Sequence, residues 1–154
     1  MIEETTTRYL ESVDNGLPGL VEGLYVVGSA ALGAWQPGAS DIDTIIVTSR
    51  PLTAEDRPAL EKVHGGMLPA PHLDGVYLDP GLLRSFPDTR QVTPFVVDGQ
   101  LKFDKPCGEL NPVLWLTLQR HGRRLRGPAI AHRAGAPSSS LSRTFGPPQP
   151  ASTP

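Results

Sequence analysis

Residues 24–48 read LYVVGSAALGAWQPGASDIDTIIVT, and this stretch decides the fold. Its first four residues are apolar and predict a short buried strand that stops at Gly28-Ser29. Small residues and a Gln-Pro-Gly turn follow, and residues 41–48 supply the β-branched side chains of a second strand. The stretch therefore predicts two strands joined by a short helix and a turn.

Gly28 and Ser29 lie where the first predicted strand runs into the short helix. Glycine lets the backbone approach a phosphate group closely, and the amides that follow can bind phosphate oxygens together with the Ser29 hydroxyl. A Gly-Ser pair after a strand is more often a plain turn. Taken alone, the pair therefore does not establish a phosphate site.

Asp41 and Asp43 are separated by one residue at the start of the second predicted strand. Residues two apart in a strand project from the same face, so both carboxylates should enter one site. Like charges this close raise one pKa unless a cation lies between them. Such oxygen ligands suit Mg²⁺, which proteins hold with one or two carboxylates plus substrate phosphates. The alternative is a solvated acidic turn before the strand.

Asp74 is a third acid, and it lies inside the apolar segment 73–78, which predicts a further strand. Burial of a carboxylate is costly unless the group is paired or lies near a metal ion. A side chain on an edge strand that faces water is the alternative interpretation.

The rest of the chain up to about residue 126 predicts an α+β domain. Amphipathic spacing and capping residues predict helices over residues 3–14, 53–64 and about 111–123, with an irregular first turn at Pro58. Residues 93–97 and 100–103 flank Asp98-Gly99, which is a strong hairpin signal. We therefore expect a mixed sheet of four or five strands flanked by helices.

The order of Gly28-Ser29, Asp41-x-Asp43 and an acid on a later strand resembles the active-site signature of the polymerase-β-like nucleotidyltransferase superfamily. Within this superfamily, the sequence of residues 28–43 is most similar to that of the aminoglycoside nucleotidyltransferases, in particular the streptomycin/spectinomycin adenylyltransferase branch. Residues 114–128, LWLTLQRHGRRLRGP, resemble the stretch where that branch passes into its second domain. The resemblance covers roughly residues 5–130.

The resemblance implies a nucleotidyltransferase fold and transfer of AMP from ATP to a hydroxyl of an aminoglycoside-like acceptor, with pyrophosphate as the leaving group. It implies that Gly28 and Ser29 hold the triphosphate and that Asp41 and Asp43 bind Mg²⁺. Asp74 stands where the family has a third carboxylate, which helps to bind metal or acts as the base for the incoming hydroxyl. The family often has Glu there, so the reach of the shorter Asp74 as a base stays open.

Composition narrows the classes of protein further. The 154 residues carry a formal net charge of −2, which argues against a non-specific nucleic-acid binder. One cysteine, Cys107, excludes an internal disulfide framework, and its turn-like surroundings argue against a reactive thiol. There is no secretory signal and no apolar run of about 20 residues, so we expect a cytoplasmic protein without a membrane partner.

Four histidines lack ligand spacing and are predicted to lie at the surface: His64, His72, His121 and His132.

The charges divide the chain near residue 110. All 16 acidic residues lie at or before Glu109, whereas the charged residues after it are all arginines. They include a cluster from Arg120 to Arg126 that we place at a helix end. We predict a nucleotidyltransferase domain over residues 1–126 and a disordered low-complexity tail over residues 127–154. The resembling enzymes continue there into a helical domain, so we expect a truncated or frame-shifted product with impaired activity.

Two alternatives stay open beside an impaired adenylyltransferase. One is a minimal nucleotidyltransferase module that works with a separate helical partner, as antitoxin-type relatives do. The other is an inactive fragment. In each case the surface near Leu114, Trp115 and Leu118 is expected to be apolar and exposed, because the domain that would cover it is missing.

Overall fold

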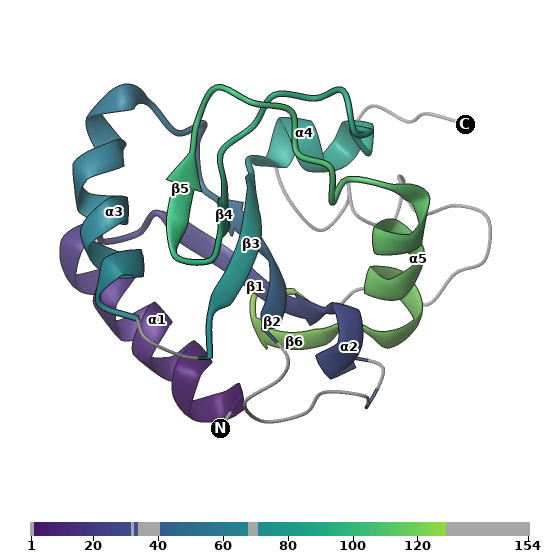
Figure 1. Ribbon diagram of the computed structural model, residues 1–154, viewed down its shortest axis with the longest axis horizontal. Coiled ribbons are helices and arrows are strands. Elements are labelled where there is room, and N and C mark those ends of the chain that lie inside the picture. The colour runs from purple at the N-terminus through teal and green to yellow at the C-terminus, as the bar shows by residue number, and fades with distance from the viewer. Residues whose placement is uncertain (1, 32, 34–40, 68–70, 129–154) are drawn as a thin grey trace.

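The computed structural model describes residues 2–31, 33, 41–67 and 71–128 of the chain. Its strands are β1 Val21–Val27, β2 Ile42–Thr48, β3 Leu73–Leu78, β4 Phe95–Val97, β5 Gln100–Lys102 and β6 Arg123–Arg126. They form a six-stranded sheet in the order β5-β4-β3-β2-β1-β6 (Figure 1). Strands β2 and β3 are parallel, and every other neighbouring pair is antiparallel. The architecture is therefore a mixed sheet, as the sequence predicts.

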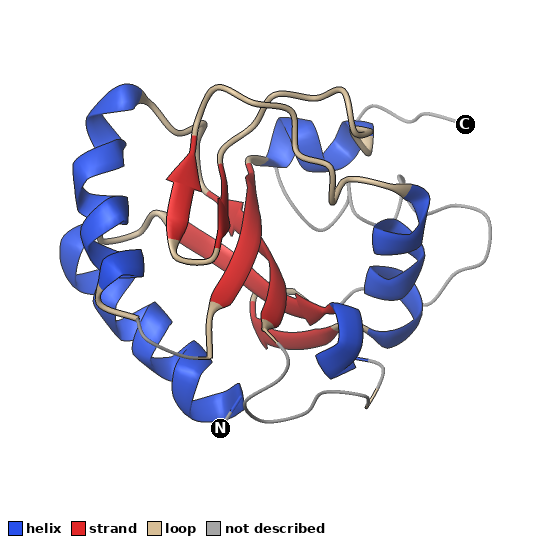
Figure 2. Ribbon diagram, in the orientation of Figure 1, coloured by secondary structure: helices blue, strands red, loops and turns tan. Residues whose placement is uncertain are grey.

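Helices lie on both sides of this sheet (Figure 2). One side carries α1 Ile2–Gly16 and α3 Arg57–Gly65, and the other carries α4 Pro80–Ser85 and α5 Pro112–His121. The short helix α2 Gly28–Ala31 follows β1, and the 3-10 helix η1 Ala54–Asp56 precedes α3.

The central strand β2 is buried on both faces, because successive side chains of a strand point to opposite sides. Ile46 packs with Tyr9 and Leu60 in the cluster beneath α1 and α3. Its neighbour Ile45 packs with Trp115 in the cluster beneath α4 and α5. A strand covered on both faces needs a continuous apolar sequence, which residues 45–47 provide.

His64 corrects the prediction of a surface histidine, since only 1% of it is exposed. It lies four residues after Leu60 in α3, and this spacing places both on the inner face of the helix. Its Nε2 atom lies 2.7 Å from the hydroxyl of Tyr77, which in turn lies 2.7 Å from the hydroxyl of Tyr9. The histidine therefore belongs to a buried polar network that joins α1, α3 and β3.

The predicted helices and strands are present, with small differences at their ends. The irregular first turn predicted from Pro58 is the 3-10 helix η1, after which α3 begins. Asn111 begins α5 as predicted, because its side chain accepts a hydrogen bond of 3.0 Å from the Leu114 amide. The hairpin predicted at Asp98-Gly99 connects β4 and β5.

Two elements differ from the prediction. Helix α4 forms where the sequence predicts only a turn. Asp79 caps its first turn, because the Asp79 carboxylate accepts a hydrogen bond of 3.0 Å from the Leu82 amide. Arg120 lies in the last turn of α5, as predicted for the arginine cluster. Arg123, Arg124 and Arg126 instead belong to β6, because α5 ends at His121 and the chain then pairs with β1. The sheet consequently has six strands rather than four or five.

The apolar surface expected on α5 lies on other residues than predicted. Trp115 and Leu118 are 8% and 1% exposed and pack in the core. The exposed apolar side chains of this helix are Val113 and Leu116, at 70% and 46% exposure. Val113 and Leu116 lie one turn apart on the outer face of α5, and Trp115 and Leu118 lie one turn apart on its inner face. The apolar sequence of α5 therefore supplies both faces.

Most of the predicted tail, from residue 129 onward, lies outside the described residues. Its first two residues lie beside the sheet, where the Tyr25 hydroxyl donates a hydrogen bond of 2.7 Å to the Pro128 carbonyl. Among the helices of the described ranges, none is long and apolar enough to cross a membrane.

Candidate active site

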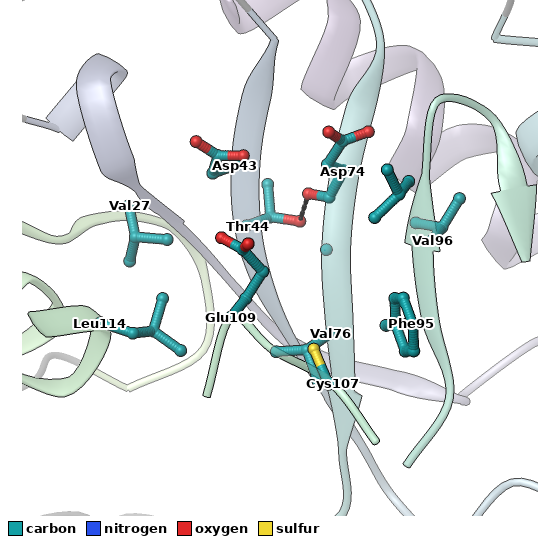
Figure 3. A pocket seen from close by; sticks show the side chains of 12 residues that line it. Val27, Asp43, Thr44, Asp74, Val76, Phe95, Val96, Cys107, Glu109 and Leu114 are labelled. Carbon is teal, nitrogen blue, oxygen red and sulfur yellow. Dashed lines mark hydrogen bonds between the residues drawn. The ribbon is translucent and has the colours of Figure 1, made fainter. Parts of the chain in front are cut away.

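Three neighbouring strands bring the predicted site residues together. Val27, the last residue of β1, is the register partner of Asp43 on β2, and Asp43 is the register partner of Asp74 on β3. Paired residues on adjacent strands share one face of the sheet, so both carboxylates project to the same side (Figure 3). Gly28 follows directly after Val27, at the beginning of α2.

Gly28 is required by geometry. Its φ of +68° lies in the left-handed region, and a Cβ atom built there would lie 2.3 Å from Oδ2 of Asp43. No other residue leaves that space free beside the carboxylate. The side chain of Ser29 lies outside the described part of the structure, so the role of its hydroxyl stays a prediction.

Asp74 is held by two hydrogen bonds, one to its carboxylate and one to its main-chain carbonyl. The Asp98 amide, from the turn between β4 and β5, donates a hydrogen bond of 3.0 Å to Oδ1 of Asp74. The Thr44 hydroxyl donates a hydrogen bond of 2.8 Å to the Asp74 carbonyl (Figure 3). The carboxylate of this third acid is thus oriented by a turn that the sequence indicates only as a hairpin.

Asp43 and Asp74 line a cavity of about 110 Å³. Glu109, from the loop before α5, contributes a third carboxylate to its wall and points toward Asp43 (Figure 3). The remaining wall is largely apolar and includes Val27, Val76, Phe95, Val96, Cys107 and Leu114. A pocket with converging polar groups on an apolar wall is the usual form of a small-molecule site.

Burial and the neighbouring negative charges raise the pKa values of Asp43 and Asp74 in the cavity. Burial raises the pKa of Asp43 to about 6, and the charges of Glu109 and Asp41 add to the rise. Burial also raises the pKa of Asp74 to about 6, against the opposing hydrogen bond from the Asp98 amide. Half-buried anions that repel each other are a fitting set of oxygen donors for a divalent cation, which would neutralise them. The residues present therefore fit Mg²⁺.

Asp41 lies at the margin of this group, directly before β2. Its charge contributes to the raised pKa of both Asp43 and Asp74, so the structure brings all three predicted acids to one end of the sheet. Its Oδ1 atom lies 3.5 Å from Nδ1 of His72, which also lies 3.3 Å from Oδ1 of Asp98. Asp41, His72 and Asp98 thus offer one ligand atom each within 4.8 Å of one another.

Sequence reasoning missed three residues of this region. His72, predicted as a surface histidine without ligand spacing, lies between two carboxylates with 27% of its side chain exposed. The sequence indicates Asp98 only as part of a turn and Glu109 only as the last acid of the chain. Their proximity to the site depends on tertiary structure. Cys107 is buried and burial raises the pKa of its thiol, in keeping with the expected lack of reactivity.

Comparison with known proteins adds three findings. Residues 8–112 match the family described as a nucleotidyltransferase domain. No curated protein sequence matches the chain. Among solved structures, a spectinomycin adenyltransferase from Enterococcus faecialis, determined with ATP and spectinomycin, shares the fold with a TM-score of 0.65 and 14% identity. The match covers 92% of this chain, which spans only 63% of that protein. The predicted fold class is thereby confirmed.

Proposed function

The chain belongs to the nucleotidyltransferase domain family, and on that premise we propose that it transfers AMP from ATP to a hydroxyl group of an aminoglycoside-like acceptor. The observation that carries the proposal is the register pairing of Asp43 with Asp74 on one face of the sheet, beside Gly28. The related adenyltransferase structure, which was determined with ATP and spectinomycin, supports this choice of donor and acceptor.

Asp41 and Asp43 would hold Mg²⁺, with Asp74 as the third carboxylate of the site. When bound, the ion supplies charge neutralisation at the phosphoryl oxygens and alignment of the attacking and leaving groups. The missing side chain of Gly28 lets the Asp43 carboxylate lie against the backbone, and the main-chain amides that follow Gly28 are suited to phosphate oxygens. These residues would hold the triphosphate with its α-phosphorus facing the acceptor.

Asp74 would act as the base. With a pKa of about 6 it is largely ionised at neutral pH, and it can take a proton from the acceptor hydroxyl. The hydroxyl oxygen forms a new bond to the α-phosphorus, the bond to the pyrophosphate oxygen breaks, and pyrophosphate leaves. The Asp98 amide occupies Oδ1 of Asp74, which leaves Oδ2 for the proton. General-base assistance of this kind contributes about 10²–10⁴-fold in rate.

The charge of the cavity supports a cationic acceptor. Asp43, Asp74 and Glu109 together place three carboxylates around a small volume, and the exposed Glu109 lies nearest to solvent. An amino sugar carries ammonium groups that such a wall attracts. We therefore propose that Glu109 faces the acceptor rather than the nucleotide.

Calorimetry with Mg·ATP tests the proposal. We expect binding to weaken about tenfold or more in Asp41→Asn and in Asp43→Asn, because each substitution removes a charge that faces the cation while it preserves the shape of the side chain. Asp104→Asn is the matched control, since Asp104 is an exposed acid outside the cavity, and its affinity should equal that of the unmodified chain. Equal affinity in all four proteins would remove the metal-binding role.

A further inference from the structure

We infer that His72 and Asp98 form a brace that positions the carboxylate of Asp41 for metal binding and that of Asp74 beside it. The inference rests on the proposed function and assigns two positioning residues to the same site. Neither residue is placed on the cavity wall, and the sequence indicates neither as part of the active site. We call these two residues and their contacts the His72–Asp98 brace.

His72 holds the segment that carries the first two acids. Its main-chain carbonyl accepts a hydrogen bond of 2.9 Å from the Ile42 amide, which lies between Asp41 and Asp43 in the chain. Its side chain reaches the same segment, since Nδ1 lies 3.5 Å from Oδ1 of Asp41. A single residue before β3 therefore contacts the beginning of β2 through both its backbone and its ring.

Asp98 holds the third acid in a similar way. Its amide donates to Oδ1 of Asp74 at 3.0 Å, and its own Oδ1 lies 3.3 Å from Nδ1 of His72. Asp98 and Gly99 have φ values of +53° and +77°, which a tight hairpin turn requires. This backbone directs the Asp98 amide toward Asp74, and the contact with His72 holds the turn in that place.

The brace meets a specific need of this site. Three carboxylates converge at one end of the sheet, and their mutual repulsion favours side-chain rotations that move them apart. His72 and Asp98 restrict Asp41 and Asp74 from outside the cavity and so keep the donor oxygens together. Groups that orient metal ligands in this manner contribute about 10–100-fold to metal affinity.

Two substitutions remove the brace without changing the site itself. His72→Phe keeps a planar ring but has no ring nitrogen, whereas His72→Asn retains an N–H group near the position of Nδ1. Asp98→Gly keeps the amide and tolerates the positive φ, but it removes the carboxylate that faces His72. We would measure Mn²⁺ affinity in the presence of ATP by electron paramagnetic resonance and the exchange rate of the residue 98 amide by NMR.

We expect His72→Phe and Asp98→Gly each to weaken Mn²⁺ binding about tenfold. The double variant should be little weaker than either single variant, because both substitutions break the same contact. His72→Asn should bind Mn²⁺ within about twofold of the unmodified chain, a rescue that a merely structural role of the ring would not produce. In the metal-free protein the residue 98 amide should exchange faster in His72→Phe.

The outcomes separate the inference from the proposed function. If Asp43→Asn loses Mn²⁺ while folded His72→Phe and Asp98→Gly bind it as the unmodified chain does, the brace is refuted and the function stands. If the unmodified chain binds no Mn²⁺ with ATP, or Asp43→Asn has no effect, the proposed function fails. In that case unchanged amide exchange in His72→Phe refutes the brace as well.

Discussion

At Asp43, folding and the proposed metal binding make opposite demands on one side chain. Burial and the neighbouring acids raise the pKa of Asp43 to about 6, above the value of 3.8 that an unperturbed aspartate has. The folded state therefore binds this proton more tightly than the unfolded state does. Stability from the protonated group is complete below about pH 4 and is lost as the pH rises through 6.

Asp43→Asn should accordingly stabilise the metal-free protein at pH 8 while it weakens the proposed metal binding. We expect a gain of about 1 kcal/mol in the free energy of unfolding, after allowance for solvent screening of a half-buried group. Urea unfolding at pH 8 and pH 4 would measure it, and the gain should vanish at pH 4. Asp104→Asn is the control without effect, and destabilisation by Asp43→Asn at pH 8 would contradict the electrostatic account.

At the scale of elements, the Tyr9–Tyr77–His64 network fixes α1 and α3 to β3. Burial lowers the pKa of His64 to about 4, from 6.5. Between these values the unfolded state binds the proton and the folded state does not, so stability falls as the pH drops from about 7 to 4. Asp43 and Asp74 act in the opposite direction over the same range, because the folded pKa of each is raised.

The double variant Asp43→Asn/Asp74→Asn isolates the histidine. Its free energy of unfolding should decrease by about 3 kcal/mol between pH 7 and pH 4, whereas that of the unmodified chain should decrease less. Chemical denaturation at several pH values would show the difference, and NMR would show whether the His64 ring stays neutral at pH 5. A ring that protonates near pH 6.5 in the folded protein would refute this assignment.

Elements with local signals could be predicted, and elements defined by distant partners could not. Helix α5 begins at Asn111-Pro112 and the β4–β5 turn lies at Asp98-Gly99. Each residue pair favours its structure without help from distant parts of the chain. Strand β6 has the sequence RRLR, which gives no β signal, and it exists because β1 offers it an edge. The same limit applies to the candidate site. Asp41 and Asp43 follow from their spacing and Asp74 from its place in an apolar strand and from the family resemblance, whereas His72, Asp98 and Glu109 come close only through loops and turns.

At the scale of the whole molecule, α5 exposes part of its apolar sequence. Val113 and Leu116 are exposed, while Leu114 from the same helix lines the cavity. Exposed apolar groups next to a site favour association, either with a separate helical partner or between copies of the chain. These two residues are therefore where the hypothesis of a partner protein can be tested.

We expect the unmodified chain to associate as its concentration rises, and Val113→Glu/Leu116→Glu to remain monomeric. Both substitutions are at exposed positions, so they should change the free energy of unfolding by no more than about 0.5 kcal/mol. Light scattering over a concentration series would measure the association. A monomeric unmodified chain at high concentration would speak against a missing partner.

The pairing of β6 with β1 also constrains how the protein can be made. Strand β1 lies at residues 21–27, and its partner β6 lies at residues 123–126. During synthesis on the ribosome, one edge of β1 stays open until roughly a hundred further residues have been added, and an open edge is a template for wrong pairing. Once β6 has paired with β1, Arg126 stabilises the pairing by donating two hydrogen bonds, of 2.9 and 2.7 Å, to the carboxylate of Asp14. Vectorial synthesis thus leaves the nascent sheet exposed until its last strand emerges.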